Sequence, residues 1–159
     1  MGGFSRKGLN FKKDTQFAGI TSNNVDYYKN VCDKGHLAPA ADFNCSYEKL
    51  KATFNYLNCA LQHENINRGP WKNLEKYERK LSETYTVIVR VVLDFDEQSL
   101  LLASVALVPS YFVKILSFNN QLQVYRFPNN ASVNHTKWED YLLTNSYLII
   151  EGCFEGNSY

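Results

Sequence analysis

The strongest hydrophobic pattern of the chain lies in its second half. Residues 84–96 carry a nearly unbroken run of apolar and β-branched side chains, which is typical of a buried strand. Polar residues at 96–98 then turn the chain into a second apolar stretch, residues 99–108. We expect these two stretches to pair as the neighbouring strands of a hairpin.

A second hairpin is predicted further along the chain. Residues 111–118 and 121–127 are rich in apolar and aromatic side chains, and only Asn119 and Asn120 separate them. Two asparagines suit a two-residue turn, because asparagine tolerates the positive φ angles that such turns require. Beyond this hairpin, residues 138–143 are expected to form a helix.

The first half of the chain is more polar, and its elements are shorter. Residues 1–30 show few periodic apolar positions and are expected to be mostly loop with short extended pieces. Residues 27–36 hold a predicted strand that ends at Gly35, a natural turn point. A turn is expected at 42–46, and a short helix or turn at 47–53.

The clearest helical pattern follows residues 54–61, which themselves fit either a strand or a helix. Asn67 can cap this helix, and Gly69-Pro70 suits its first turn. The spacing of the following residues predicts that the helix continues to residue 81. The positions at helical spacing are Trp71, Leu74, Tyr77, Glu78 and Leu81.

Together these elements predict one α+β domain over residues 1–159 with a mostly antiparallel sheet. A hydrophobic content of 45% and an aromatic content of 14% support a buried core and argue against disorder. The formal charge of +1 means that a nucleic-acid site would depend on local clustering of basic residues. No apolar run is long enough to cross a bilayer and no signal peptide is visible, so no membrane partner is expected and the compartment stays open.

His36 is the first residue with candidate chemistry. It follows a glycine, which would let a backbone turn present the imidazole ring at the mouth of a cleft. An ordinary histidine pKa of about 6.5 suits a general base that takes a proton from water near neutral pH. The structural alternative is a half-buried histidine bonded to a backbone carbonyl, and on His36 alone that alternative is favoured.

Asn67, Glu75 and Arg79 form a second candidate group. They recur at multiples of four residues, which would place them on one face of the predicted helix. An amide oxygen, a carboxylate and a guanidinium together suit a Mg²⁺ and phosphate site. Alternatively, Asn67 only caps the helix and Glu75–Arg79 is a surface ion pair worth less than about 1 kcal/mol. Each signal is weak by itself, but their joint occurrence in this order is informative.

The motifs that contain these residues resemble those of the DNA/RNA non-specific endonuclease family. Residues 33–40 (Asp-Lys-Gly-His-Leu-Ala-Pro-Ala), 58–62 and 67–75 correspond to its Asp-Arg-Gly-His, Asn-Ile-x-Pro-Gln and Asn-x-Gly-x-Trp-x-x-Leu-Glu motifs. The match is specific over residues 32–81 and weaker at 108–115, a Val-Pro-x-x-Phe-x-Lys segment. The resemblance implies a ββα-metal (His-Me finger) nuclease fold.

The resemblance also implies a role for each residue. His36 would activate the attacking water, and Asn67 would be the single protein ligand of a Mg²⁺ ion, for which Mn²⁺ is expected to substitute. Glu75 would hold metal-bound waters, and Arg79 would stabilise the charge that develops on phosphorus. The substrate would be DNA, RNA or both, cut to 5′-phosphate and 3′-hydroxyl ends. Relatives often dimerise, so a homodimer is an expected assembly.

Substrate binding is expected to involve residues around this core. Asn58 and Gln62 match polar positions that support the site in the family. Arg68, Lys72 and Lys76 form a basic stripe beside it, which could follow a nucleic-acid backbone without reading its sequence. The alternative for this stripe is a solvated helix face, and spacing alone does not reject it.

Several positions depart from the family pattern. Lys34 stands where the family has an arginine, so the positive charge is kept but the bidentate fork is lost and activity is expected to be lower. Leu61 replaces a proline before Gln62. The N-terminus is expected to be short, either trimmed or belonging to a minimal member whose sheet edge a partner covers. Leu9 stands near the position of a further family arginine, for which Arg6, Lys7 or Lys12 could substitute.

Three other functions remain open from the sequence. Lys34, the unmatched arginine and the short N-terminus favour a weakly active or inactive relative that serves as a nucleic-acid-binding or protein-interaction module. A zinc site or a catalytic Cys/His pair ranks lower, since neither has a supporting motif. The four cysteines are expected to be free and partly buried thiols, although three disulfide pairings remain possible. The residues of the zinc alternative are Cys32, His36, Cys45 and Cys59.

Overall fold

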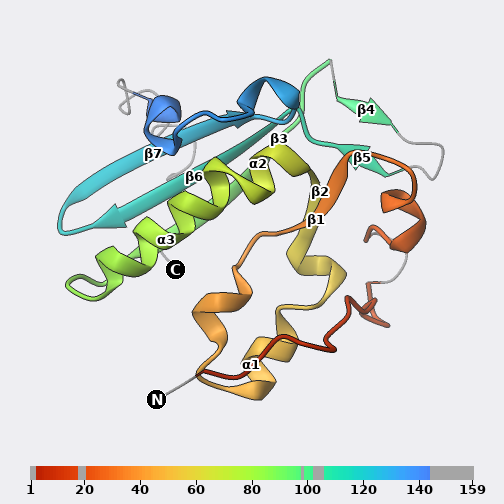
Figure 1. Ribbon diagram of the computed structural model, residues 1–159, viewed down its shortest axis with the longest axis horizontal. Coiled ribbons are helices and arrows are strands. Elements are labelled where there is room, and N and C mark those ends of the chain that lie inside the picture. Colours follow the sequence, from red (N-terminus) through yellow and green to blue (C-terminus); the bar gives the residue numbers. More distant parts are fainter. Residues whose placement is uncertain (1–2, 18–20, 98, 102–105, 144–159) are drawn as a thin grey trace, which may run out of the picture.

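The computed structural model describes residues 3–17, 21–97, 99–101 and 106–143. Figure 1 shows two parts: a long curved sheet crossed by helix α3, and a smaller part that contains α1 and the N-terminal segment. Strands β1 and β2 lie between them. The strands are β1 (Cys32–His36), β2 (Cys59–His63), β3 (Ile88–Asp94), β4 (Leu100–Leu101), β5 (Leu107–Val108), β6 (Tyr111–Phe118) and β7 (Gln121–Pro128), and the α-helices are α1 (Tyr47–Ala52), α2 (Glu64–Arg68) and α3 (Pro70–Ser82).

The three-stranded sheet has the order β3-β6-β7 and is antiparallel throughout. Its β6–β7 hairpin is the one that the sequence predicts, with Phe118 paired to Gln121 across the turn. Both turn residues have positive φ angles, 44° at Asn119 and 58° at Asn120. This geometry is that of a mirror-image turn, whose twist matches the twist of the flanking strands.

The predicted pairing of residues 84–96 with 99–108 is wrong. Strand β3 instead pairs with β6, with Val92 opposite Val113, whereas β4 pairs with β5. Strand β3 is also an edge strand rather than a buried one, since Ile88 is 51% exposed and Val92 is 44% exposed. The apolar composition of residues 84–96 therefore predicts a strand correctly, but it predicts neither how deeply the strand is buried nor which strand it pairs with.

Helix α3 covers one face of the sheet, as Figure 1 shows. Trp71 is its main anchor, with ring centroids 5.6 Å from Phe112 and 5.7 Å from Phe127 in edge-on contacts. Leu74 and Leu116 are fully buried in the same cluster. Burial of side chains this large contributes about 1.5–3 kcal/mol each, so the helix that carries Glu75 and Arg79 is held firmly.

Strands β1 and β2 form a separate antiparallel pair, with His36 opposite Cys59 and Cys32 opposite His63. Asn129, just after β7, connects this pair to the large sheet. Its Nδ2 donates to the carbonyls of Leu61 (2.9 Å) and Pro109 (2.8 Å), and its Oδ1 accepts from the backbone N–H of His63 (2.7 Å). The motif-bearing strands are thereby fixed relative to the core.

The N-terminal segment is tied to the smaller part of the molecule. Leu9 and Phe11 pack against a buried cluster of Ala40, Leu50 and Phe54. The backbone N–H of Lys12 donates to the carbonyl of Phe54 at 2.9 Å. These contacts hold the beginning of the chain beside β1, which brings its charged residues near the motif.

Several other predicted elements differ from the structure in extent or in type. The strand predicted at 27–36 is confined to β1 and continues past Gly35 to His36. Residues 54–61 contain a 3-10 helix (Tyr56–Asn58) followed by β2, and residues 138–143 contain a 3-10 helix (Trp138–Tyr141). Further 3-10 helices lie at Asn24–Tyr27, Ala40–Phe43 and Ala131–Val133. No helix within the described residues is long and apolar enough to cross a membrane. Cys32, Cys45 and Cys59 are free thiols, and Cys153 lies outside the described residues.

Candidate active site

The sequence-predicted site residues converge on one cleft of about 710 Å³. It lies between β1, the residues that follow it, helices α2 and α3, and the N-terminal segment. Asn58 and Gln62 do not line it. The predicted residues that do are Lys34, His36, Asn67, Arg68, Lys72, Glu75 and Arg79.

Gly35 is required by close packing rather than by a turn. It lies inside β1 without a positive φ angle, and a Cβ built on it would lie 2.5 Å from Gln62 Oε1 and 2.6 Å from Gln62 Cβ. Gln62 is fully buried against this glycine. Our interpretation of Gln62 as a substrate residue is therefore revised, because its side chain lies behind β1 and supports the strand that carries His36.

Asn58 likewise supports the segment after His36. Its Oδ1 accepts from the backbone N–H of Ala38 (2.8 Å), while its Nδ2 donates to the carbonyls of Ala38 (2.9 Å) and Thr53 (3.0 Å). Each of these bonds is made to the backbone, so the side chain is already committed. We therefore revise Asn58 from a substrate contact to a residue that fixes the wall of the cleft.

His36 lies at the end of β1 with its ring between two aromatic side chains. The ring centroids of Phe11 and Phe54 lie 4.8 and 5.0 Å away. The buried Nε2 atom has no hydrogen-bond partner among the described residues, so the carbonyl-bonded alternative for this atom is not what the structure shows. Burial, and then the positive charge of Arg6, lower the His36 pKa to about 4. The ring is therefore neutral at neutral pH and able to accept a proton.

Asn67 is not the cap of the long helix. It lies inside the short helix α2, and the following Gly69 separates α2 from α3 with φ −106° and ψ −115°. Its Nδ2 donates to Asp33 Oδ2 at 2.8 Å. The Oδ1 atom receives no hydrogen bond from the described part of the chain. Asn67 thus reaches the cleft from a separate helix, and the argument from one shared helix face was wrong for this residue.

Glu75 and Arg79 do lie on α3, one turn apart, but they are not a simple surface pair. Arg79 Nη1 contacts Asp42 Oδ1 at 2.8 Å, and Asp42 lies on the 3-10 helix Ala40–Phe43. Burial raises the pKa of Glu75 to about 7, although the positive charge of Lys114 acts in the opposite direction. No described residue donates a hydrogen bond to the Glu75 carboxylate. A partly desolvated carboxylate that accepts no hydrogen bond is suited to holding a ligand or its water.

Lys34 is engaged by aromatic rings. Its ammonium lies 5.8, 5.6 and 5.5 Å from the ring centroids of Phe11, Tyr27 and Tyr56, and it also donates to Asn24 Oδ1. Cation–π contacts of this kind contribute about 0.5–2 kcal/mol each. The residue that replaces the family arginine therefore lines the cleft with its charge already partly satisfied.

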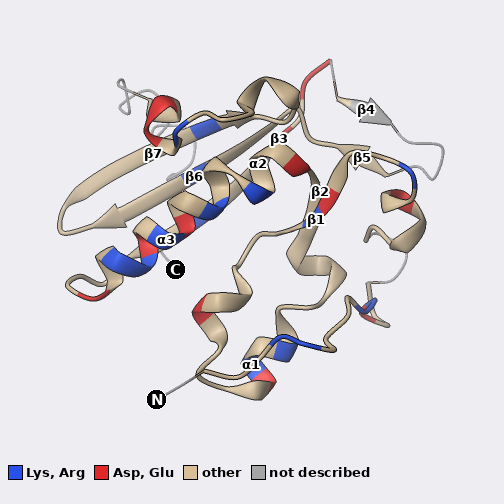
Figure 2. Cartoon of the chain, in the orientation of Figure 1, with Lys and Arg blue, Asp and Glu red and all other residues tan. Residues whose placement is uncertain are grey.

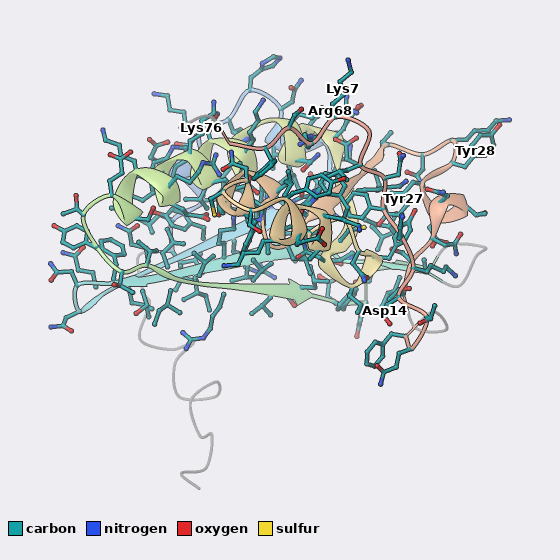
Figure 3. All side chains as sticks on the ribbon, turned by 90° about the horizontal axis from the view of Figure 1, so that it is seen from below. Lys7, Asp14, Tyr27, Tyr28, Arg68 and Lys76 are labelled. Atoms are coloured by element: carbon teal, nitrogen blue, oxygen red, sulfur yellow. The ribbon has the colours of Figure 1, made fainter. Side chains whose placement is uncertain are left out.

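The basic stripe divides into paired and unpaired members. Arg68 is bonded to Asp33 and Glu64, and Lys76 donates to Asn73 at 3.2 Å. Lys72 lines the cleft and has no ion pair or hydrogen bond to a described side chain. Figure 2 shows Lys and Arg interleaved with acidic residues along α3, and Figure 3 shows Arg68 and Lys76 reaching the same outer side of the molecule. The stripe is thus a mixed face of which only part borders the cleft.

Two residues at the cleft had no role assigned from the sequence. Arg6 is exposed and lines the cleft, and its guanidinium has no hydrogen-bonded or ion-paired partner among the described residues; the sequence offered it only as one of three substitutes for a missing arginine. Asp33 belongs to the motif but had no function there. Its contacts lie 34 and 35 residues away, so no local pattern could have revealed them.

The cleft offers oxygen atoms for a hard divalent cation held mainly by water rather than a cage of protein ligands. The described residues contain no group of three or more His, Cys, Asp or Glu side chains placed to hold a metal. The zinc alternative on Cys32, His36, Cys45 and Cys59 is therefore not formed. Asn67 Oδ1 and the Glu75 carboxylate, both oxygen donors without partners, are what a hard cation with several waters requires.

Comparison with known proteins shows which family shares these motifs and this fold. The profile of the DNA/RNA non-specific endonucleases matches residues 2–147. The chain belongs to the DNA/RNA non-specific endonuclease family. A chain in the crystal structure of the EndoG/EndoGI complex superimposes with a TM-score of 0.77 at 24% identity, covering 93% of this chain and 68% of that chain. This likeness confirms the predicted α+β, ββα-metal fold.

The curated relatives of the chain include mitochondrial nucleases. Human mitochondrial endonuclease G is 37% identical over 81 residues, which is 50% of this chain and 27% of that protein. The zebrafish (Danio rerio) mitochondrial nuclease EXOG is 34% identical over 87 residues, 54% of this chain and 25% of that protein. The chain thus spans about a quarter of the length of these relatives in the matched region.

Proposed function

We propose that this protein is a metal-dependent nuclease that hydrolyses phosphodiester bonds of DNA, RNA or both without sequence preference. The observation that carries the proposal is the environment of His36. An imidazole kept neutral by burial, with an unbonded Nε2, lines the same cleft as Asn67 and Glu75. A neutral imidazole next to oxygen ligands and cations suits activation of water against a phosphate.

In the proposed reaction His36 takes one proton from a water molecule whose oxygen attacks phosphorus. The bond between phosphorus and the 3′ oxygen breaks, and that oxygen takes up a proton, which leaves 5′-phosphate and 3′-hydroxyl ends. Arg79 stabilises the negative charge on the phosphoryl oxygens, and its pairing with Asp42 keeps its guanidinium at the cleft. Bound at Asn67 Oδ1, Mg²⁺ or Mn²⁺ would supply Lewis-acid stabilisation of that charge and of the leaving oxygen. Glu75 would hold water molecules around it.

Substrate binding in this proposal depends on the unpaired cations at the cleft. Arg6 and Lys72 reach the cleft from different segments, the N-terminal segment and α3, and neither forms an ion pair with a described side chain. Contacts from such cations to phosphates carry no sequence information and weaken steeply with salt. Binding is therefore expected to be sequence-tolerant and salt-sensitive.

The test is a cleavage assay on plasmid DNA and on RNA with Mg²⁺ or Mn²⁺. Wild type is expected to cut, and His36→Ala is expected to lose about 100-fold or more of the rate, the usual contribution of a general base. His135→Asn is the matched control, because His135 is exposed, lies outside the cleft and has a positive φ of 61° that asparagine tolerates. If wild type and His36→Ala leave both substrates equally intact with either metal, the catalytic proposal fails.

The second candidate function is a nucleic-acid-binding module without turnover. It is favoured by one observation, the engagement of Lys34 by three aromatic rings where the family has a free arginine fork. Salt-dependent binding of a labelled oligonucleotide, together with no cleavage under either metal, would support this function instead.

A further inference from the structure

Asp33, on strand β1, accepts hydrogen bonds from the last two residues of helix α2, Asn67 and Arg68. Its Oδ2 accepts from Asn67 Nδ2 at 2.8 Å and from Arg68 Nε at 2.9 Å, and its Oδ1 accepts from Arg68 Nη2 at 2.7 Å. Arg68 Nη1 also contacts Glu64 at 2.6 Å, one turn earlier on the same helix. The Asp33 carboxylate is therefore held by a bidentate contact with the Arg68 guanidinium, and the ion pair with Glu64 holds that guanidinium on α2.

This arrangement determines which end of the Asn67 amide faces the cleft. An ionised carboxylate can only accept hydrogen bonds, whereas an amide has one accepting end and one donating end. The donating Nδ2 must therefore face Asp33, and Oδ1 must be the free end. Oδ1 receives no hydrogen bond from the described part of the chain. A cation can bind the oxygen of an amide but not its NH₂ group, so the orientation matters for the proposed site.

We propose that Asp33 is a positioning residue that holds the Asn67 amide with its oxygen presented to the metal, and that Arg68 serves this contact rather than the substrate. The inference rests on the proposed function of Asn67 as the metal ligand. In this arrangement Asp33 is not itself a ligand, because both of its oxygens already accept hydrogen bonds from the neighbouring helix. Without the carboxylate the amide rotates about its last side-chain bond and presents either end to the cleft.

The position of Asp33 in the β1–β2 pair explains how it contacts side chains 34 and 35 residues further along the sequence. It is the second residue of β1 and lies opposite Gln62 in the β1–β2 pair, and α2 begins directly after β2. The strand pairing therefore sets the distance between the carboxylate and the α2 side chains. The side chain of Arg68 is 64% exposed, but its ion pair with Asp33 holds the guanidinium in one orientation at the edge of the cleft.

The experiment measures Mn²⁺ binding to the metal-free protein by calorimetry and by electron paramagnetic resonance, with no substrate present. Asp33→Ala is expected to weaken Mn²⁺ binding by about 10–100-fold, the usual effect of removing a group that orients a metal ligand. Asp33→Asn retains one acceptor for Asn67 Nδ2 and should lose less. Asn67→Ala should lose at least as much affinity as Asp33→Ala. Thermal melting of each variant establishes that the protein measured is folded.

The control is Asp94→Asn, which removes a carboxylate from a comparable arginine pair. Asp94 Oδ2 accepts from Arg126 Nε (3.1 Å) and Nη2 (2.9 Å), and neither residue lines the cleft. This variant should keep wild-type Mn²⁺ affinity even if its melting temperature falls. If Asp33→Ala and Asp33→Asn bind Mn²⁺ as wild type does while Asn67→Ala does not, Asp33 has no positioning role. If Asn67→Ala also binds normally, the metal-ligand role in the proposed function fails first.

Discussion

At the scale of single residues, burial changes the ionisation of the two groups that matter most to the proposed chemistry. It lowers the pKa of His36 to about 4 and raises the pKa of Glu75 to about 7. Both shifts favour the neutral side chain, which is what partial removal from water does to any ionisable group. Each shift therefore makes the free energy of unfolding depend on pH, and the sign of the shift gives the direction.

Glu75→Gln should stabilise the metal-free protein in alkaline solution. The carboxyl titrates near its ordinary value of 4.5 in the unfolded chain but near 7 in the folded one, so wild type loses stability as the pH rises between these values. The difference in free energy of unfolding between the variant and wild type should be about 1–2 kcal/mol larger at pH 8 than at pH 5, a figure that allows for partial solvent exposure. Urea unfolding with a chelator at both pH values measures this. An equal difference at both would contradict the buried carboxylate.

Gly35→Ala should destabilise the protein through a single contact. The new Cβ would lie 2.6 Å from Gln62 Cβ, an atom that cannot move without its backbone, and overpacking of this kind costs about 1–3 kcal/mol. In a Gln62→Gly background, which removes this Cβ, most of the cost should disappear. A double-mutant cycle by urea unfolding measures the coupling, and additive effects of the two changes would show that Gln62 is not what excludes the side chain.

At the scale of elements, hydrophobic pattern and turn chemistry were reliable where the partner is local. The β6–β7 hairpin follows from two apolar stretches and the two asparagines between them, and its structure is as predicted. The same reasoning gave the wrong partner for strand β3. Its partner β6 begins 17 residues after β3 ends, beyond the short β4 and β5. Pairing over such a distance depends on which sheet can cover α3, and the sequence of 84–96 does not contain that information.

Replacement of Asn120 tests the turn. Its φ of 58° lies in the left-handed region, where a β-branched side chain clashes with the backbone. Asn120→Val should destabilise the protein by about 1–2 kcal/mol, whereas Asn120→Gly should be neutral or slightly stabilising. Thermal or urea unfolding of the two variants compares them directly. An equally stable valine variant would be inconsistent with the mirror-image turn.

At the scale of the whole molecule, a buried ion pair joins the large sheet to the helix of the proposed site. Lys114 on β6 is 0% exposed and contacts Glu78 on α3 at 2.8 Å, while its ammonium lies 4.0 Å from the Trp71 ring centroid. The sequence placed Lys114 in a family segment but assigned it no partner. Its position beneath α3 means that one buried ion pair joins the sheet to the helix that carries Glu75 and Arg79.

Lys114→Met should destabilise the protein by about 3–5 kcal/mol, because it leaves Glu78 buried without a counter-charge. The double variant Lys114→Met/Glu78→Leu should recover most of that loss, since an apolar pair needs no compensation. Lys76→Met, an exposed lysine on the same helix, is the control and should change stability by less than about 0.5 kcal/mol. Urea unfolding at pH 7 provides the comparison. Equal losses in the single and double variants would mean that packing, not charge, holds this contact.

The sequence by itself determined the α+β class, the β6–β7 hairpin and the family, because these depend on local periodicity, turn residues and short motifs. It also identified seven residues that share the cleft, although Asn67 reaches it from a helix of its own and two further predicted residues, Asn58 and Gln62, do not line it. Only the tertiary structure decided what each side chain contacts. Asp33 meets Arg68, Arg79 meets Asp42, and Lys34 lies among aromatic rings. The two ion pairs join residues 35 and 37 positions apart, which local patterns do not encode, and they distinguish the arginines that a carboxylate holds in place from Arg6 and Lys72, whose charged groups have no described partner.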